Sequence, residues 1–102
     1  MKRLALILAV AVGLPVTAAA HYPVCACTMK DASTVRCEGG FSDGTPAPGV
    51  PVEVIAYDEQ VIVRGVTDET SGFEFARPSG EFFVLFDAGP GHVVEIDHPE
   101  IR

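Results

Sequence analysis

The sequence predicts an all-β protein, a small two-sheet antiparallel β-sandwich of about seven strands that follows a cleaved signal peptide. The first observation is composition, because Leu85 is the only leucine after residue 20 whereas Val, Ile and Phe are frequent. These β-branched and aromatic side chains pack well on pleated surfaces. The second observation is the regular spacing of short apolar runs between turns rich in Gly, Pro and Asp, which is typical of β-sandwiches.

The first 20 residues have the layout of a secretory signal peptide. A basic start precedes an apolar run over residues 4–14, and three alanines that end at Ala20 provide a cleavage site. We expect cleavage after Ala20, so that the mature chain begins at His21 and is periplasmic or secreted. The apolar run is shorter than a transmembrane helix of ~20 residues, so no stable membrane anchor is expected.

The expected domain organisation has three parts. Residues 1–20 are the signal peptide, residues 21–41 a hairpin that contains all the cysteines, and residues 42–102 a β-sandwich that forms one compact domain with the hairpin. Removal of 20 of the 102 residues leaves 82, which limits the size of the core and of any cleft. The small size therefore favours a binding protein over an enzyme.

The acidic balance of the chain excludes one class of partner. Without Lys2 and Arg3 the chain keeps five basic residues against 14 acidic ones, a formal charge of −9. Phosphate backbones are bound by basic surfaces, so nucleic acid is not an expected partner. An acidic surface suits cations, basic proteins or solubility alone.

Strands and turns are expected to alternate along the mature chain. The expected strands cover residues 25–29, 34–38, 50–57, 61–67, 73–75, 81–86 and 92–97. The expected turns and loops cover residues 30–33, 42–49, 58–60, 68–72, 77–80 and 87–91. The first turn places Cys27 opposite Cys37, and the pair Gly39-Gly40 predicts a bulge or sharp bend before Phe41.

The last hairpin organises the predicted core, because apolar side chains on paired strands share a face with a period of two. The expected pairs on its apolar face are Phe86 with His92, Val84 with Val94 and Phe82 with Ile96. The opposite face is half polar, which suits partial exposure or a second contact. The predicted core consists of Val52, Val54, Phe73, Phe75, Phe82, Val84, Phe86, Val94 and Ile96.

The three cysteines predict one disulfide and one spare thiol in an oxidising compartment. Cys27 with Cys37 is the preferred pair, because directly opposed strand residues have Cβ atoms near disulfide range. Cys25 with Cys37 is the alternative, by diagonal reach. A further hypothesis is that these cysteines and His21 ligate a soft metal such as Cu(I) or Zn.

His21 is the anchor of the predicted metal site. Signal cleavage frees its α-amino group, which titrates close to neutrality, and the imidazole of the same residue completes a chelate that suits Cu(II) or Ni(II). His98, if the chain ends meet, or a nearby carboxylate supplies a further ligand. Reduced Cys25 and Cys27 instead favour Cu(I). His92 and His98 lie at opposite ends of one expected strand, ~17 Å apart, and so do not share an ion without help from another segment.

Several turn and core motifs resemble a known family. They are DGTPAPGVPVEV at 43–54, GVTD at 65–68, FEF at 73–75 and GEF at 80–82. Together they resemble the transthyretin-like sandwich domains called carboxypeptidase regulatory-like, over roughly residues 39–97. The family usually has a glycine two residues before the first Phe of the FEF motif, whereas this chain has Ser71. Such motifs specify a fold better than a function.

A narrower similarity concerns the histidine close behind the signal peptide. Small periplasmic sandwich proteins that accompany bacterial nickel and cobalt uptake systems share this combination. This resemblance implies a periplasmic or membrane transport protein as the partner.

The sequence lacks the patterns of common catalytic sites. No Ser/His/Asp order, phosphate-cradling glycine loop or HExxH spacing is present, so we expect no enzyme. The predicted function is a non-catalytic periplasmic binding or accessory module for a transition metal (Cu, Ni or Co) or for a partner protein. The alternative is a purely structural or interaction domain stapled by its disulfide, with no small ligand.

Overall fold

Seven strands and one short 3-10 helix build the part of the chain that the computed structural model describes, residues 21–102. The strands are β1 (Pro23–Met29), β2 (Thr34–Phe41), β3 (Pro51–Ala56), β4 (Val61–Val66), β5 (Gly72–Ala76), β6 (Phe82–Asp87) and β7 (Val93–Asp97), and the helix is η2 (His98–Glu100). The all-β prediction is therefore confirmed. The predicted signal peptide lies outside the described residues.

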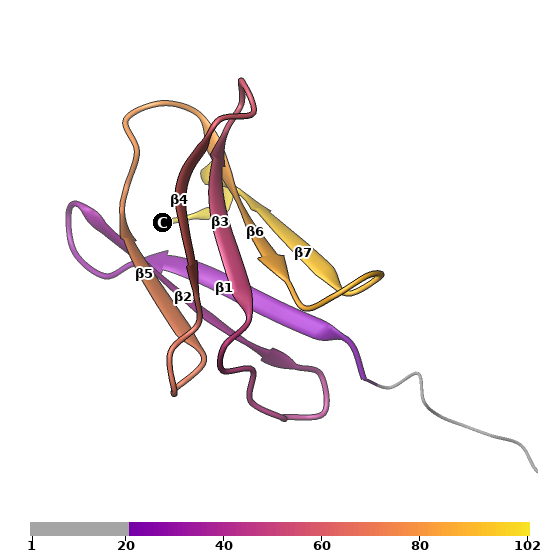
Figure 1. Cartoon of the computed structure of the whole chain (residues 1–102). Coiled ribbons are helices and arrows are strands. Elements are labelled where there is room, and N and C mark those ends of the chain that lie inside the picture. The colour runs from indigo at the N-terminus through magenta and orange to yellow at the C-terminus, as the bar shows by residue number, and fades with distance from the viewer. Residues whose placement is uncertain (1–20) are drawn as a thin grey trace, which may run out of the picture.

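The strands form two antiparallel sheets that pack face to face (Figure 1). The smaller sheet has the order β1-β2-β5 and the larger sheet the order β4-β3-β6-β7. At the open sides of the sandwich, β1 contacts β7 and β4 contacts β5. The N-terminal hairpin β1-β2 thus supplies two of the three strands of one layer. Within residues 21–102, no helix has the length and apolar character needed to cross a membrane.

The expectation that Gly39-Gly40 makes a bulge or bend is wrong. Strand β2 runs unbroken through both glycines, and Gly39 pairs with Cys25 of β1. Gly39 instead makes room for an aromatic ring from the opposite sheet, because a Cβ atom there would lie 2.5 Å from Cε1 of Phe86. Gly65 of β4 is used in the same way, since its Cβ would lie 2.7 Å from Cε1 of Phe73.

The predicted register of the last hairpin is wrong by two residues. Val84 pairs with Ile96 and Phe86 with Val94, so that His92 lies in the loop and not opposite Phe86. The reason is a closed turn in which Ala88 N–H donates to the carbonyl of His92 and His92 N–H donates to the carbonyl of Gly89. Because the shift is an even number of residues, each side chain keeps its predicted face.

The predicted core is largely confirmed. Seven of its nine members are buried, namely Val52, Val54, Phe75, Phe82, Val84, Phe86 and Ile96, while Phe73 and Val94 are partly buried against them. Val35, Cys27 and Cys37 complete the core from the smaller sheet. The C-terminal Ile101 is also buried, and its carbonyl accepts a hydrogen bond from Arg77.

Two buried hydroxyl groups hold the long loop between β2 and β3 against the sandwich. Thr67 accepts a hydrogen bond from Val50 N–H and donates to the carbonyl of Ala47. Ser71 accepts from Ala47 N–H at 2.8 Å. Ser71 has a positive φ of 67°, so this serine takes a left-handed conformation that glycine adopts more readily, and its hydroxyl anchors the loop.

Candidate functional site

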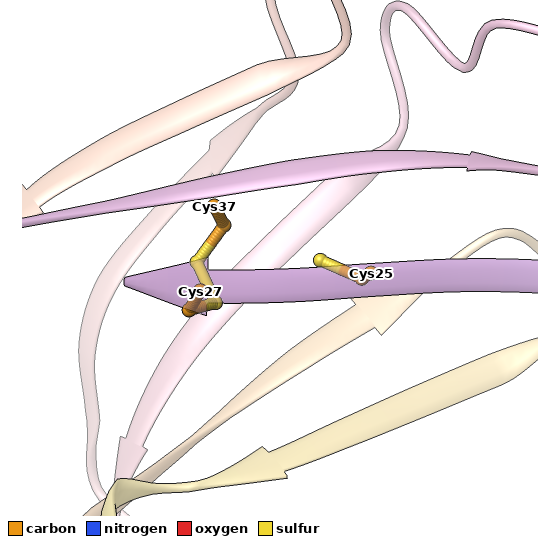
Figure 2. Close-up of side chains that lie close together, drawn as sticks. All are labelled: Cys25, Cys27 and Cys37. Atoms are coloured by element: carbon orange, nitrogen blue, oxygen red, sulfur yellow. A yellow bond between two sulfur atoms is a disulfide. The ribbon is translucent and has the colours of Figure 1, made fainter. Parts of the chain in front are cut away.

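Three cysteine sulfurs gather between β1 and β2 on the inner face of the smaller sheet (Figure 2). Cys27 and Cys37 are directly opposite each other, with Cα atoms 3.9 Å apart, and form the predicted disulfide. Cys25, two residues before Cys27, is the spare thiol and lies on the same face of β1. All three sulfur atoms lie within 4.8 Å of one another.

The Cys25 thiol is held in its protonated form at neutral pH. Burial, and then the nearby charge of Glu38, raise its pKa to about 11. Because the thiolate is the nucleophile in disulfide exchange, this thiol attacks the adjacent disulfide slowly. The Cys27–Cys37 bond closes a loop with a sequence separation of 10, which stabilises the domain by roughly 2–3 kcal/mol in the loop-entropy account.

His21 lies away from the cysteines, at the start of β1. Its ring stacks on Phe41 at a centroid distance of 4.7 Å, and its Nδ1 atom is 2.9 Å from a carboxylate oxygen of Asp43. Hydrogen bonds from the hydroxyl and N–H of Thr45, and then the contact with His21, hold the pKa of Asp43 well below its usual value. A chelate formed by the α-amino group and the ring of His21 would use this same Nδ1 atom. Asp43 is therefore the carboxylate placed to supply a further ligand.

His98 and His92 do not lie beside His21. The ring of His98 contacts Phe82 and Tyr57, and its segment reaches the far end of β1, where Met29 N–H donates to the carbonyl of Arg102. Strand β1 separates the two ends by ~20 Å, so the chain ends do not place His21 beside His98. His92 is exposed, and its Nδ1 atom is 3.0 Å from the carbonyl oxygen of Pro90 in its own loop.

The outer face of the larger sheet carries an open hollow of about 530 Å³ that sequence reasoning did not locate. Its walls are Ile55, Tyr57, Glu59 and Phe83. Ile55 of β3 and Phe83 of β6 are direct cross-strand neighbours, so their side chains stand together on the outer face. Val61 of β4 pairs with Ile55 and extends the apolar surface to the sheet edge.

A hydrogen bond between distant segments fixes one wall of this hollow. The Tyr57 hydroxyl donates to a carboxylate oxygen of Asp97 at 2.6 Å. This bond, and then partial burial, raise the pKa of Tyr57 to about 12. Asp97 is itself held in place as the N-cap of η2, where it accepts from His98 N–H. The wall is therefore formed before any ligand arrives.

Ion pairs lie on both outer faces of the sandwich, and on the larger sheet Arg64 pairs with Glu53 at 2.7 Å. On the smaller sheet, Arg36 and Lys30 form ion pairs with outward-facing carboxylates, including a 3.0 Å contact from Arg36 to Glu74. Around the hollow, Glu59 and Glu81 have no ion-pair partner among residues 21–102. The hollow is apolar at its base and negatively charged at its rim.

The sequence contained one signal for this surface. The outward residues of the last hairpin, Phe83 and Leu85 among acidic neighbours, predicted a half-polar face suited to partial exposure or a second contact. The hydrogen bond from Tyr57 to Asp97 could not be predicted from local sequence patterns, because the two residues are 40 positions apart.

Comparison with known proteins returned no similarity that bears on function. Neither the family models nor the curated proteins nor the solved structures contain a match to this chain.

Proposed function

We propose that this chain is an exported, non-catalytic binding module that docks a partner protein on the outer face of its larger sheet. The partner offers an apolar side chain flanked by basic residues. The observation that carries the proposal is the apolar hollow whose lining includes the carboxylate of Glu59, which has no ion-pair partner among residues 21–102. A periplasmic or membrane transport protein is the kind of partner we expect.

Two properties of the hollow support docking. Its base and wall present aromatic and aliphatic surface, with 48% of Tyr57 exposed, and such residues provide the central contacts of protein interfaces. The negative charge of Glu59, on a domain with a formal charge of −9, selects basic partners and accelerates their approach.

The proposal predicts which probe peptides bind. We expect acetyl-KKFKK-amide to bind saturably to residues 21–102 and to shift the backbone NMR signals of Ile55, Glu59 and Phe83. Acetyl-KKAKK-amide lacks the ring, and acetyl-EEFEE-amide reverses the charge. Both controls should bind at least fivefold more weakly.

Three outcomes contradict docking at this hollow. They are equal affinity for the basic and acidic peptides, shifts centred on the smaller sheet, and the absence of saturable binding. The last outcome would leave the structural alternative as the better account. The metal hypothesis rests on a different part of the molecule and is independent of this test.

A further inference from the structure

We propose that the three cysteines bind one Cu(I) ion when the Cys27–Cys37 disulfide is reduced. The site is separate from the docking hollow, because it lies on the inner face of the smaller sheet. The motivating observation is that the sulfur atoms of Cys25, Cys27 and Cys37 lie within 4.8 Å of one another (Figure 2). A disulfide staple alone requires only two of them.

The spacing of the sulfurs suits a single small ion. Metal–thiolate bonds are ~2.3 Å long, so three sulfurs around one ion in a plane are about 4 Å apart. The Sγ atom of Cys25 lies within 4.8 Å of the other two sulfurs, so a small movement brings it to this separation. After reduction, the sulfurs of Cys27 and Cys37 separate to a similar distance by side-chain rotation, while the antiparallel pairing of β1 with β2 keeps their Cα atoms opposite each other.

The ligand set favours Cu(I) over Zn(II). Thiolates select soft ions, and both of these ions are soft enough to bind them. Structural zinc sites are four-coordinate, whereas this cluster provides three sulfurs and no fourth His, Asp or Glu ligand atom among the described residues. Cu(I), by contrast, is satisfied by two or three thiolates. His21, which the sequence suggested as a further ligand, contacts Asp43 and Phe41 instead.

The chemistry has two balanced steps. A dithiol reductant exchanges with the disulfide, so the Cys27–Cys37 bond breaks, both cysteines gain hydrogen and the reductant becomes the disulfide. Cu(I) then replaces the thiol protons of Cys25, Cys27 and Cys37, which are released to solvent, and the copper keeps its oxidation state. The oxidised domain has only the Cys25 thiol to offer. Reduction therefore determines whether the site exists.

The test is a competition for Cu(I) between the protein and bicinchoninate under anaerobic conditions. Residues 21–102 are reduced with a phosphine, freed of it and titrated. We expect the reduced protein to take one equivalent of Cu(I) at concentrations where the oxidised protein takes none. Reduced Cys25→Ser should bind at least tenfold more weakly, and its oxidised form should melt like the wild type because it keeps the disulfide.

Thermal unfolding distinguishes Cu(I) binding by the folded protein from Cu(I) binding by an unfolded chain. Cu(I) should raise the melting temperature of the reduced protein, because a ligand that prefers the folded state stabilises it. If reduction alone unfolds the domain, Cu(I) should restore its near-ultraviolet circular dichroism. Equal Cu(I) uptake by the oxidised and reduced forms, equal affinity after Cys25→Ser, or binding that leaves the chain unfolded would each overturn the proposal.

Discussion

The contact between Gly39 and Phe86 across the two sheets predicts strong energetic coupling. In Gly39→Ala, the new Cβ atom would lie 2.5 Å from Cε1 and 2.7 Å from Cζ of the ring, whereas carbon atoms in contact are ~3.5–4.0 Å apart. The ring of Phe86 is completely buried, so it must retreat by about 1 Å into packed surroundings. Overpacking of this kind costs about 1–3 kcal/mol of unfolding free energy.

The double mutant supplies the magnitude of the coupling. Phe86→Leu alone should cost roughly 1–2 kcal/mol, less than the ~3–5 kcal/mol typical of Phe→Ala, because leucine leaves a smaller cavity. Leucine also lacks the ring atoms that meet the alanine methyl. In the Phe86→Leu background, Gly39→Ala should therefore cost close to nothing. We expect a coupling energy of about 1–3 kcal/mol, the difference between these two costs.

Urea unfolding with the disulfide intact measures the unfolding free energy of the wild type, the two single mutants and the double mutant. Constant m-values confirm that these free energies can be compared. Gly80→Ala is the matched control, since a Cβ at Gly80 meets no atom within 4 Å, and it should change stability by less than about 0.5 kcal/mol. Additive effects of Gly39→Ala and Phe86→Leu, within about 0.5 kcal/mol, would refute the account of how this glycine is used.

Two further predictions concern the ionisable groups of the N-terminal hairpin. Cys25 should react with iodoacetamide at a rate that rises with pH up to about 11, because its raised pKa keeps it protonated. The folded state holds this proton more tightly than the unfolded state, so stability present below pH ~9 should be lost as the pH rises toward 11. A reactivity midpoint near pH 8.5, the value of an exposed thiol, would contradict this burial. For His21, intact mass of the exported protein should show a chain that starts there. Calorimetric titration of Cu(II), Ni(II) and Co(II) should then give tighter binding than in a variant with one extra residue ahead of His21, and equal affinities would exclude an N-terminal site.

The sequence predicted features of the fold that depend on local pattern. The alternation of apolar and polar residues, together with the Gly, Pro and Asp residues of the turns, predicted where the strands lie. The pairing of Cys27 opposite Cys37 followed from the short turn between their strands. The two errors have different causes. The role of Gly39 depends on tertiary packing, because it makes room for the ring of Phe86 from the other sheet. The last hairpin has a loop of the predicted length that is shifted by one residue along the chain, to residues 88–92, and is closed by hydrogen bonds within the loop.

The candidate sites were predictable only in part. The cysteine cluster follows from two facts visible in the sequence, the CxC spacing and the opposed pair. The structure does not bring together His21 and His98, which the sequence suggested as ligands of one metal, because the segment of His98 reaches the far end of β1. The hollow on the larger sheet could not be located, because its walls come from two segments that are far apart in the sequence, residues 55–59 and Phe83.

Glu59 offers the most direct test of the claim that the hollow is a binding site. It lines the hollow and has a φ of 76°, a left-handed conformation that costs a non-glycine residue about 1–2 kcal/mol. We infer that its side chain is retained for binding rather than for stability. Two substitutions separate the contribution of Glu59 to binding from its effect on stability. Glu59→Gly removes both the strain and the charge, whereas Glu59→Gln removes only the charge.

The decisive measurement is the unfolding free energy of Glu59→Gly together with its affinity for acetyl-KKFKK-amide. The variant should be more stable than the wild type by roughly 0.5–1 kcal/mol, since glycine adopts this conformation freely but gains entropy when unfolded. Its affinity for the peptide should fall about two- to fivefold, and Glu59→Gln should lose affinity without gaining stability. Unchanged peptide affinity in both variants would contradict the account.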